Sequence, residues 1–158
     1  MTSDNKKLFS GRTLARSQAL QLLFQAESRS TSVSSILAGT YLISQGPLDP
    51  FAERLSLGTD AHRAALDALI IELARNWDIT RMLAVDRNLL RLAIYEMCYI
   101  DDIDVAVTIN ESVNLAKAYG TDESSKFVNG ILGKVAELIA HHDELLERVG
   151  LASSAPSE

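Results

Sequence analysis

Few side chains in this sequence have the types and spacing that a reactive centre requires. Zinc needs three or four Cys, His or carboxylate ligands in register, but His141 and His142 point in different directions on a helix and His62 stands alone. Cys98, the single cysteine, lies in a very apolar segment, where a thiol is typically a small inert hydrophobe. Nucleophile-elbow, phosphate-loop and dinucleotide-binding glycine motifs are lacking. We therefore expect no catalysis, no metal site and no cofactor.

Polar residues inside otherwise apolar segments are more informative. Burying such groups is costly unless they are paired, so we expect them to pair with one another and to fix how helices dock. Glu96 and Glu111 could be imagined as paired carboxylates with the run Asp101–Asp104. A solvated helix end explains that run, however, and no other residue completes a site. The predicted structural polar residues are Arg91, Glu96, Asn110, Glu111 and Asn129.

The formal net charge is -6 over 158 residues, and it is unevenly distributed. Residues 1–30 hold five basic and two acidic side chains, a net of +3, which leaves -9 for residues 31–158. A basic head on an acidic body suits contact with phosphate at one face and with a basic partner at another. Simple solvation of these N-terminal lysines and arginines is an equally good explanation of the charge alone.

Apolar residues recur at three- and four-residue steps, which is typical of helices, and no run shows strand-like alternation. Residues 86–100 are apolar almost all round and predict a central helix packed on several sides. Gly58 is expected to end a short helix, and Gly120 and Gly150 to cap two others. The expected helices cover about residues 11–28, 33–44, 51–57, 60–77, 86–100, 105–119 and 122–149. The sequence thus predicts an all-α bundle of about seven helices.

Composition and punctuation indicate one globular domain. The hydrophobic fraction is 47% and the charged fraction 23%, both ordinary for such a domain. We expect residues 1–10 to form a flexible basic arm, 11–150 the domain, and 151–158 a disordered tail. The longest uncharged stretch, 30–48, is too polar for a membrane span, and no secretory signal opens the chain. A single cysteine fits a reducing, cytoplasmic setting.

Several segments resemble the NusB family. VDRNLLRLAIYEM, VAVTINESVNLAKAYG and SSKFVNGILGKVA are similar to its C-terminal half, ARSQALQLLFQ to its first helix, and NWDITRML to its middle. INESVNLAKAYG followed by KFVNGIL is the most specific match, and the resemblance covers roughly residues 12–138. It implies two packed three-helix sub-bundles. It also implies binding of single-stranded boxA-type RNA together with the ribosomal protein NusE, in the antitermination complex of RNA polymerase, notably on ribosomal RNA operons.

The resemblance also implies an RNA face. Arg12 and Arg16 match the outer positions of the family's arginine-rich start, but Thr13 and Leu14 stand where basic residues are often found. We therefore expect few phosphate contacts, a shallow salt dependence and strong reliance on the partner, with Lys6 and Lys7 as compensating cations. The other aromatic and basic positions of that face match Phe24, Tyr119, Lys126 and Phe127. Aromatic rings suit such a face because unstacked bases need flat apolar surfaces, and basic side chains suit it because phosphates need positive charge. Core packing is the alternative for Phe24 and Phe127.

Two acidic residues complete the implied sites. Asp86, at the start of the central helix, is a candidate contact for NusE, and Glu123 matches an acidic position that tempers RNA binding. The main alternative is a helical protein-binding or dimerising scaffold whose RNA binding has weakened. A domain attached to an RNA methyltransferase and a helix-turn-helix DNA regulator fit less well, because no second domain follows and no helix is a basic recognition helix. Monomer and homodimer both remain open.

Overall fold

The computed structural model describes residues 9–152, which form eight α-helices and one 3-10 turn and contain no strand. Within this range no helix is both long enough and apolar enough to cross a bilayer. The elements are α1 (Gly11–Ser28), α2 (Val33–Ala38), α3 (Pro50–Ala61), α4 (Arg63–Leu73), η2 (Ile79–Arg81), α5 (Ala84–Tyr99), α6 (Val105–Tyr119), α7 (Asp122–Ala140) and α8 (Glu144–Val149). The all-α prediction is confirmed. The expected N-terminal arm lies almost wholly outside the described residues, Lys6 and Lys7 included.

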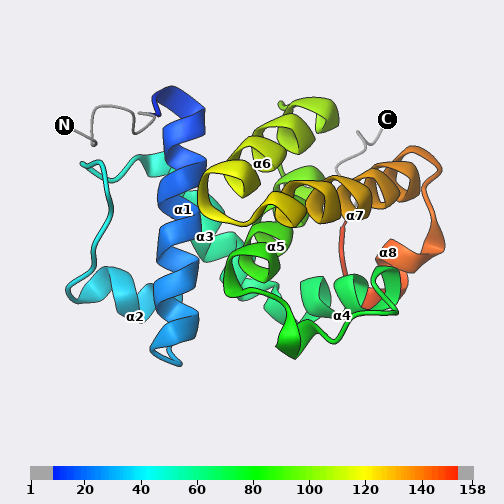
Figure 1. Ribbon diagram of the computed structural model, residues 1–158, viewed down its shortest axis with the longest axis horizontal. Helices are drawn as coiled ribbons and strands as arrows, with labels where there is room; N and C mark the ends of the chain where they lie inside the picture. Colours follow the sequence, from blue (N-terminus) through cyan, green and yellow to red (C-terminus); the bar gives the residue numbers. More distant parts are fainter. Residues whose placement is uncertain (1–8, 153–158) are drawn as a thin grey trace.

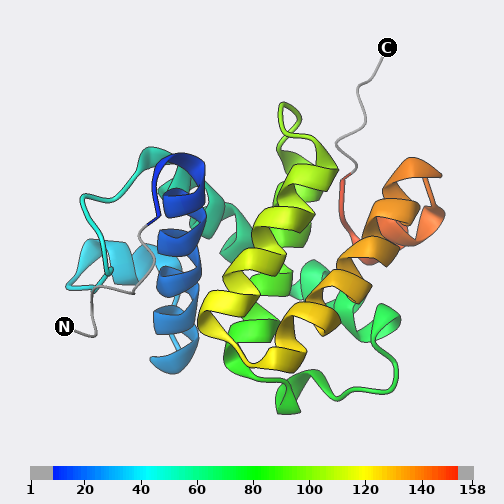
Figure 2. The same cartoon turned by 45° about the horizontal axis from the view of Figure 1, so that its top comes forward.

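Helix α5 holds the molecule together. It contacts α1 and α3 on one side and α4, α6 and α7 on the other, as Figures 1 and 2 show. Eleven of its sixteen residues are buried, with Leu89, Leu90 and Ile94 completely so. Full burial of one such side chain stabilises the fold by about 1.5–3 kcal/mol. The predicted central helix is therefore the core of the fold. It connects the N-terminal helices (α1–α3) with the C-terminal helices around it (α4 and α6–α8).

Aspartate N-caps start four of the elements. Each carboxylate accepts a hydrogen bond from the backbone N–H two residues further on, and a cap of this kind contributes about 1 kcal/mol. The four are Asp49 for α3, Asp78 for η2, Asp104 for α6 and Asp143 for α8. The acidic run after α5 thus ends in a helix cap, as its composition predicted.

The predictions for α2 and α3 were wrong in their boundaries. Helix α2 ends at Ala38, and residues 39–49 continue without regular structure. Helix α3 runs through Gly58, and the ring of Tyr95 lies where the Cβ of any other residue at that position would be. The glycine therefore permits a close approach between α3 and α5 instead of ending α3.

The C-terminal boundaries also differ from the expected ones. Helix α4 ends at Leu73, short of the expected residue 77. The last predicted helix is broken at His142, which is exposed and whose φ of 49° lies in the left-handed region. Leu151 is buried and Ala152 donates its N–H to the Tyr99 hydroxyl at 3.0 Å. The domain therefore extends two residues into the expected tail, and 153–158 lie outside the described residues.

Residues 39–49, which we call the strap, lie along α1 and are held by a row of glutamines. Gln25 accepts from the Leu42 N–H at 3.0 Å and donates to the Leu42 carbonyl at 2.6 Å. Gln21 accepts from the Ser44 N–H at 2.8 Å and donates to its hydroxyl at 3.1 Å. Gln18 donates to the carbonyls of Gln45 and Pro47 and accepts from the N–H of Asp49. Side-chain amides thereby satisfy backbone groups that a strand or helix would otherwise pair.

Candidate nucleic-acid interface

A groove of about 500 Å³ lies between α1, the strap, the start of α5 and the end of α6. We call it the α1–strap groove. Its size falls in the range of small-molecule sites. Phe24 is 45% exposed and Tyr119 37% exposed, so two aromatic rings are accessible in it. The remaining lining is aliphatic and amide-bearing, with one guanidinium and no carboxylate: Leu20, Gln21, Gln25, Ser28, Arg29, Leu42 and Val85.

Helical phase places Phe24 in the groove. Leu20 and Leu23 of α1 are buried against the core, whereas Phe24 falls on the edge of that apolar face and turns outward. The core-packing alternative for Phe24 therefore does not describe its position. The ring is free to offer a flat face to a ligand.

Hydrogen bonds fix the ring of Tyr119 at the end of α6. Its hydroxyl is 2.6 Å from the Ser17 hydroxyl and accepts from Gln21 Nε2 at 3.2 Å. Gln21 also binds Ser44 of the strap. The aromatic ring, α1 and the strap are thus one connected unit.

Arg12 lies at the first turn of α1, exposed to solvent. Its guanidinium carbon is 3.9 Å from the centroid of the Phe51 ring, a cation–π arrangement. No ion pair engages Arg12 within residues 9–152, so its N–H groups stay available to an anion. Phe51 was not recognised in the sequence as a support for this arginine.

Arg16 is buried and does not lie on the exposed face that its expected contact with RNA requires. Its side chain is 4% exposed, and Nε and Nη2 donate to the Glu96 carboxylate at 2.8 Å and 2.6 Å. Nη1 lies 3.3 Å from Glu111, and Thr108 donates its hydroxyl to Glu96 at 2.7 Å. Burial alone would lower the pKa of Arg16, but Glu96 and Glu111 raise it beyond its ordinary value. Arg16 therefore joins α1 to α5 and α6.

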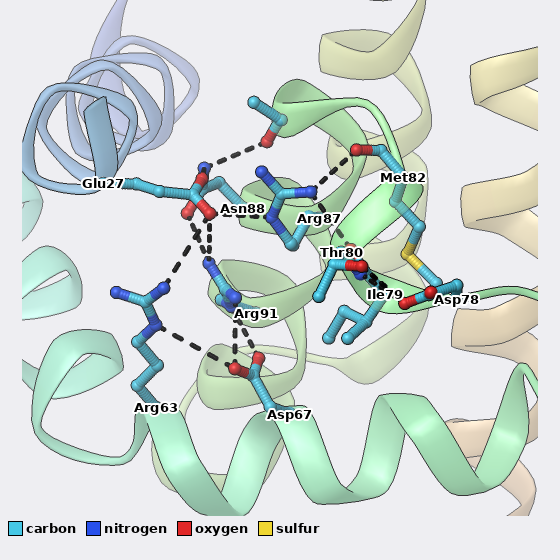
Figure 3. Close-up of polar contacts among 11 residues, drawn as sticks. Glu27, Arg63, Asp67, Asp78, Ile79, Thr80, Met82, Arg87, Asn88 and Arg91 are labelled. Atoms are coloured by element: carbon cyan, nitrogen blue, oxygen red, sulfur yellow. Dashed lines mark hydrogen bonds and ion pairs between the residues drawn. The ribbon is translucent and has the colours of Figure 1, made fainter. Parts of the chain in front are cut away.

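A second polar cluster joins α1, α4 and α5 (Figure 3). Arg91 donates to both carboxylate oxygens of Asp67, at 2.6 Å and 3.1 Å. Glu27 accepts from Arg87 Nε at 2.8 Å and from Asn88 Nδ2 at 2.7 Å, and lies 3.6 Å from Arg91. Arg91 and Glu96 are thus buried and paired, though with partners on other helices and not with each other.

Asn110 and Asn129 are exposed, so the expectation that they are buried pairing residues was wrong. Both line a second, shallower groove of about 460 Å³ between α6 and α7, together with Lys117 and Lys126. Phe127 lies elsewhere, half-buried and edge-on to Trp77 with ring centroids 5.5 Å apart. The predicted RNA residues of α7 are therefore not part of the α1–strap groove.

The two acidic candidates differ in accessibility. Asp86 is 8% exposed and its Oδ1 has no hydrogen-bond partner among residues 9–152, so little of this side chain faces a partner. Glu123 is exposed in the first turn of α7, one turn before Lys126. Only Glu123 is placed to act on a ligand through solvent.

The described residues do not form a catalytic or metal-binding cluster. Burial raises the pKa of the Cys98 thiol to about 12, so it stays protonated at neutral pH and is a poor nucleophile. In the described part of the chain no three His, Cys or acidic side chains are grouped to hold a metal ion.

The fold and the α1–strap groove combine an all-helical frame with two exposed aromatic rings beside one guanidinium. Comparison with known proteins makes this specific. The chain belongs to the NusB family, whose sequence profile matches residues 13–137. Relatives that match it are named transcription antitermination protein NusB and are not enzymes, as the sequence predicted for this chain.

Individual relatives match most of the chain. Transcription antitermination protein NusB of Desulfitobacterium hafniense is 46% identical over 138 residues, which cover 84% of this chain and 93% of that protein. Its counterpart from Bacillus subtilis is 41% identical, covering 78% and 93%. The T. maritima NusB structure superposes with a TM-score of 0.71 at 36% identity, covering 82% and 93%. A crystal structure of NusB and NusE in complex with double-stranded RNA has the same fold, with a TM-score of 0.65 at 23% identity over 80% of this chain and 96% of that one.

Proposed function

We propose that this protein binds single-stranded boxA-type RNA together with NusE and thereby supports antitermination by RNA polymerase, notably on ribosomal RNA operons, in the cytoplasm. The observation that carries the proposal is the pair of exposed rings, Phe24 and Tyr119, in one groove free of carboxylates. Single-stranded RNA is held by stacking of unpaired bases on such rings and by cations along its phosphates. A solved structure of the same fold, which contains NusB, NusE and double-stranded RNA, supports the choice of NusE and RNA as partners.

The cation supply of this face is small. Of the three basic residues expected to bind RNA, Arg12 and Lys126 are exposed and unpaired, whereas Arg16 is ion-paired with Glu96. Each neutralised phosphate of a single strand contributes about 0.7 to the slope of log affinity against log salt. We therefore propose that NusE supplies part of the RNA affinity, and that it contacts the surface at the start of α5, beneath which Asp86 is buried.

Phe24→Ala is expected to weaken binding of boxA-type RNA about 5- to 150-fold, since stacking of one base on an aromatic ring is worth about 1–3 kcal/mol. Fluorescence anisotropy with labelled RNA at fixed salt, with and without NusE, measures the change. Ile71→Ala is the matched control, because Ile71 is also an exposed apolar side chain but lies on α4. Equal affinities of Phe24→Ala and wild type would show that the ring does not bind RNA.

Glu123→Lys is expected to tighten RNA binding, because it removes a negative charge from the first turn of α7 and adds a positive one beside Lys126. Glu123→Asn separates the two effects. It removes the repulsion only and should leave the salt slope unchanged, whereas lysine should raise the slope by up to about 0.7. A salt titration of Kd distinguishes these results, and unchanged or weaker binding by both variants contradicts the role given to Glu123.

The alternative function is a protein-binding or dimerising scaffold with weakened RNA binding, and the burial of Arg16 favours it. Gel shifts with RNA, with NusE and with both separate the two functions. RNA binding that strengthens when NusE is added supports antitermination. NusE binding without any RNA binding supports the scaffold.

A further inference from the structure

Leu42 is unusual for an exposed leucine because its backbone is fixed. Its side chain is 75% exposed, the highest value among the large apolar residues of the described chain. Both of its backbone polar groups are bound by Gln25. An exposed residue in an irregular segment is ordinarily mobile. Here the backbone is anchored, and the apolar side chain lines the α1–strap groove together with Phe24. Such an arrangement suits contact with a ligand.

Arg29 adds a cation at the same groove. It follows α1 directly, and Nη1 donates to the Thr40 carbonyl of the strap at 3.0 Å. No carboxylate within residues 9–152 pairs with it, so its other N–H groups are free. A guanidinium presents paired donors that match the oxygens of a phosphate.

The combined chemistry fits one kind of ligand. Aromatic and aliphatic side chains offer apolar faces, the amides of Gln21 and Gln25 lie at the groove, and a guanidinium stands beside them. A helix of a partner protein is about 10–12 Å across and buries a longer apolar stripe than these few side chains provide. A flat heteroaromatic ring with an attached phosphate matches both the apolar faces and the cation.

We propose that the strap is the outer wall of a nucleobase slot: one unpaired base of the RNA inserts between Phe24 and Leu42, and Arg29 binds an adjoining phosphate. The inference rests on the proposed RNA-binding function and extends it to two residues outside the segments that resemble the family most. Leu42 then acts by covering the face of the base that the Phe24 ring leaves open. Arg29 acts by charge and hydrogen bonding.

The test uses the full chain and boxA-type RNA carrying 2-aminopurine at successive positions, whose fluorescence falls on stacking. Wild type should quench one position most strongly. Leu42→Ser should weaken binding about 3- to 10-fold, from the loss of part of a leucine's burial, and should relieve the quenching at that same position. Arg29→Gln should weaken binding and lower the salt slope by about 0.7 without moving the quenched position.

Controls separate this inference from the proposed function. Ile71→Ser, at another exposed apolar residue, which lies on α4, should change neither affinity nor quenching. If wild type binds RNA but Leu42→Ser and Arg29→Gln bind and quench as wild type does, the slot is wrong and the proposed function stands. If wild type binds no RNA with or without NusE, both fail. If Leu42→Ser weakens NusE binding instead of RNA binding, the groove is a protein surface and the slot is again wrong.

Discussion

Glu96→Ala is expected to lower the free energy of unfolding by about 3–5 kcal/mol, the typical cost of removing one partner of a buried ion pair. The substitution leaves the Arg16 guanidinium, 4% exposed, with a single 3.3 Å contact to Glu111. It also removes the acceptor of the Thr108 hydroxyl. Because the pair joins α1 to α5, the loss should appear as destabilisation of the whole domain.

Urea unfolding followed by circular dichroism measures this change. Glu137→Ala is the control, since Glu137 is an exposed glutamate in the last turn of α7 and makes no side-chain contact in the described structure. The double variant Arg16→Met with Glu96→Leu should be more stable than Glu96→Ala, because the only carboxylate that loses its ion pair, Glu111, is 21% exposed and hence partly hydrated. A loss below about 1 kcal/mol for Glu96→Ala would mean that water reaches Arg16.

Glu27→Ala is expected to cost about 3 kcal/mol at neutral pH, the lower end of the same range, because Glu27 is 20% exposed. Its carboxylate accepts from Arg87 and Asn88 and lies near Arg63 and Arg91 (Figure 3). Removing it leaves Arg91 bound to Asp67, while Arg87 keeps its contacts to backbone carbonyls. The helices most affected should be α1 and α5.

The same variant carries a pH signature. Burial acts to raise the pKa of Glu27, but the hydrogen bonds from Arg87 and Asn88 and the charges of Arg87 and Arg91 outweigh it, and the pKa lies below the ordinary 4.5. The stabilisation is therefore fully present above pH 4.5 and is lost as the pH falls through the folded-state pKa. The difference between wild type and Glu27→Ala should shrink on acidification below pH 4.5, which urea midpoints along a pH series would show. A difference independent of pH contradicts this account.

Local sequence pattern predicted those elements whose ends are set locally. The boundaries of α1 at Gly11 and Ser28 follow from its apolar stripe, and α6 begins after its own cap at Asp104. Local pattern failed to predict a helix boundary where a residue distant in sequence affects the packing at that boundary. Gly58 lies inside α3, where Tyr95, thirty-seven positions away, occupies the space of a Cβ, so this glycine permits packing and does not end the helix. No propensity at position 58 contains that information.

The site was predicted in part for the same reason. Phe24 and Tyr119 follow from the family resemblance and do share a groove, whereas Arg16 was misplaced because its burial depends on Glu96, eighty positions away. Leu42 and Arg29 were missed because the course of the strap depends on contacts with α1. One indication was available: Gln18, Gln21 and Gln25 recur at three- and four-residue steps, as a row of amides facing a single neighbour would.

The glutamine row has a consequence for how this surface can change. At Leu42 the amide of Gln25 recognises only main-chain atoms, so the identity of the side chain there does not affect its anchoring. Leu42 can therefore be replaced by another residue without loss of these two hydrogen bonds, provided that the length of the strap is kept. Because the backbone of the strap is anchored to α1 through glutamine side chains, its exposed side chains can be substituted during evolution or by design. Such substitutions can favour another ligand at little cost in the free energy of unfolding.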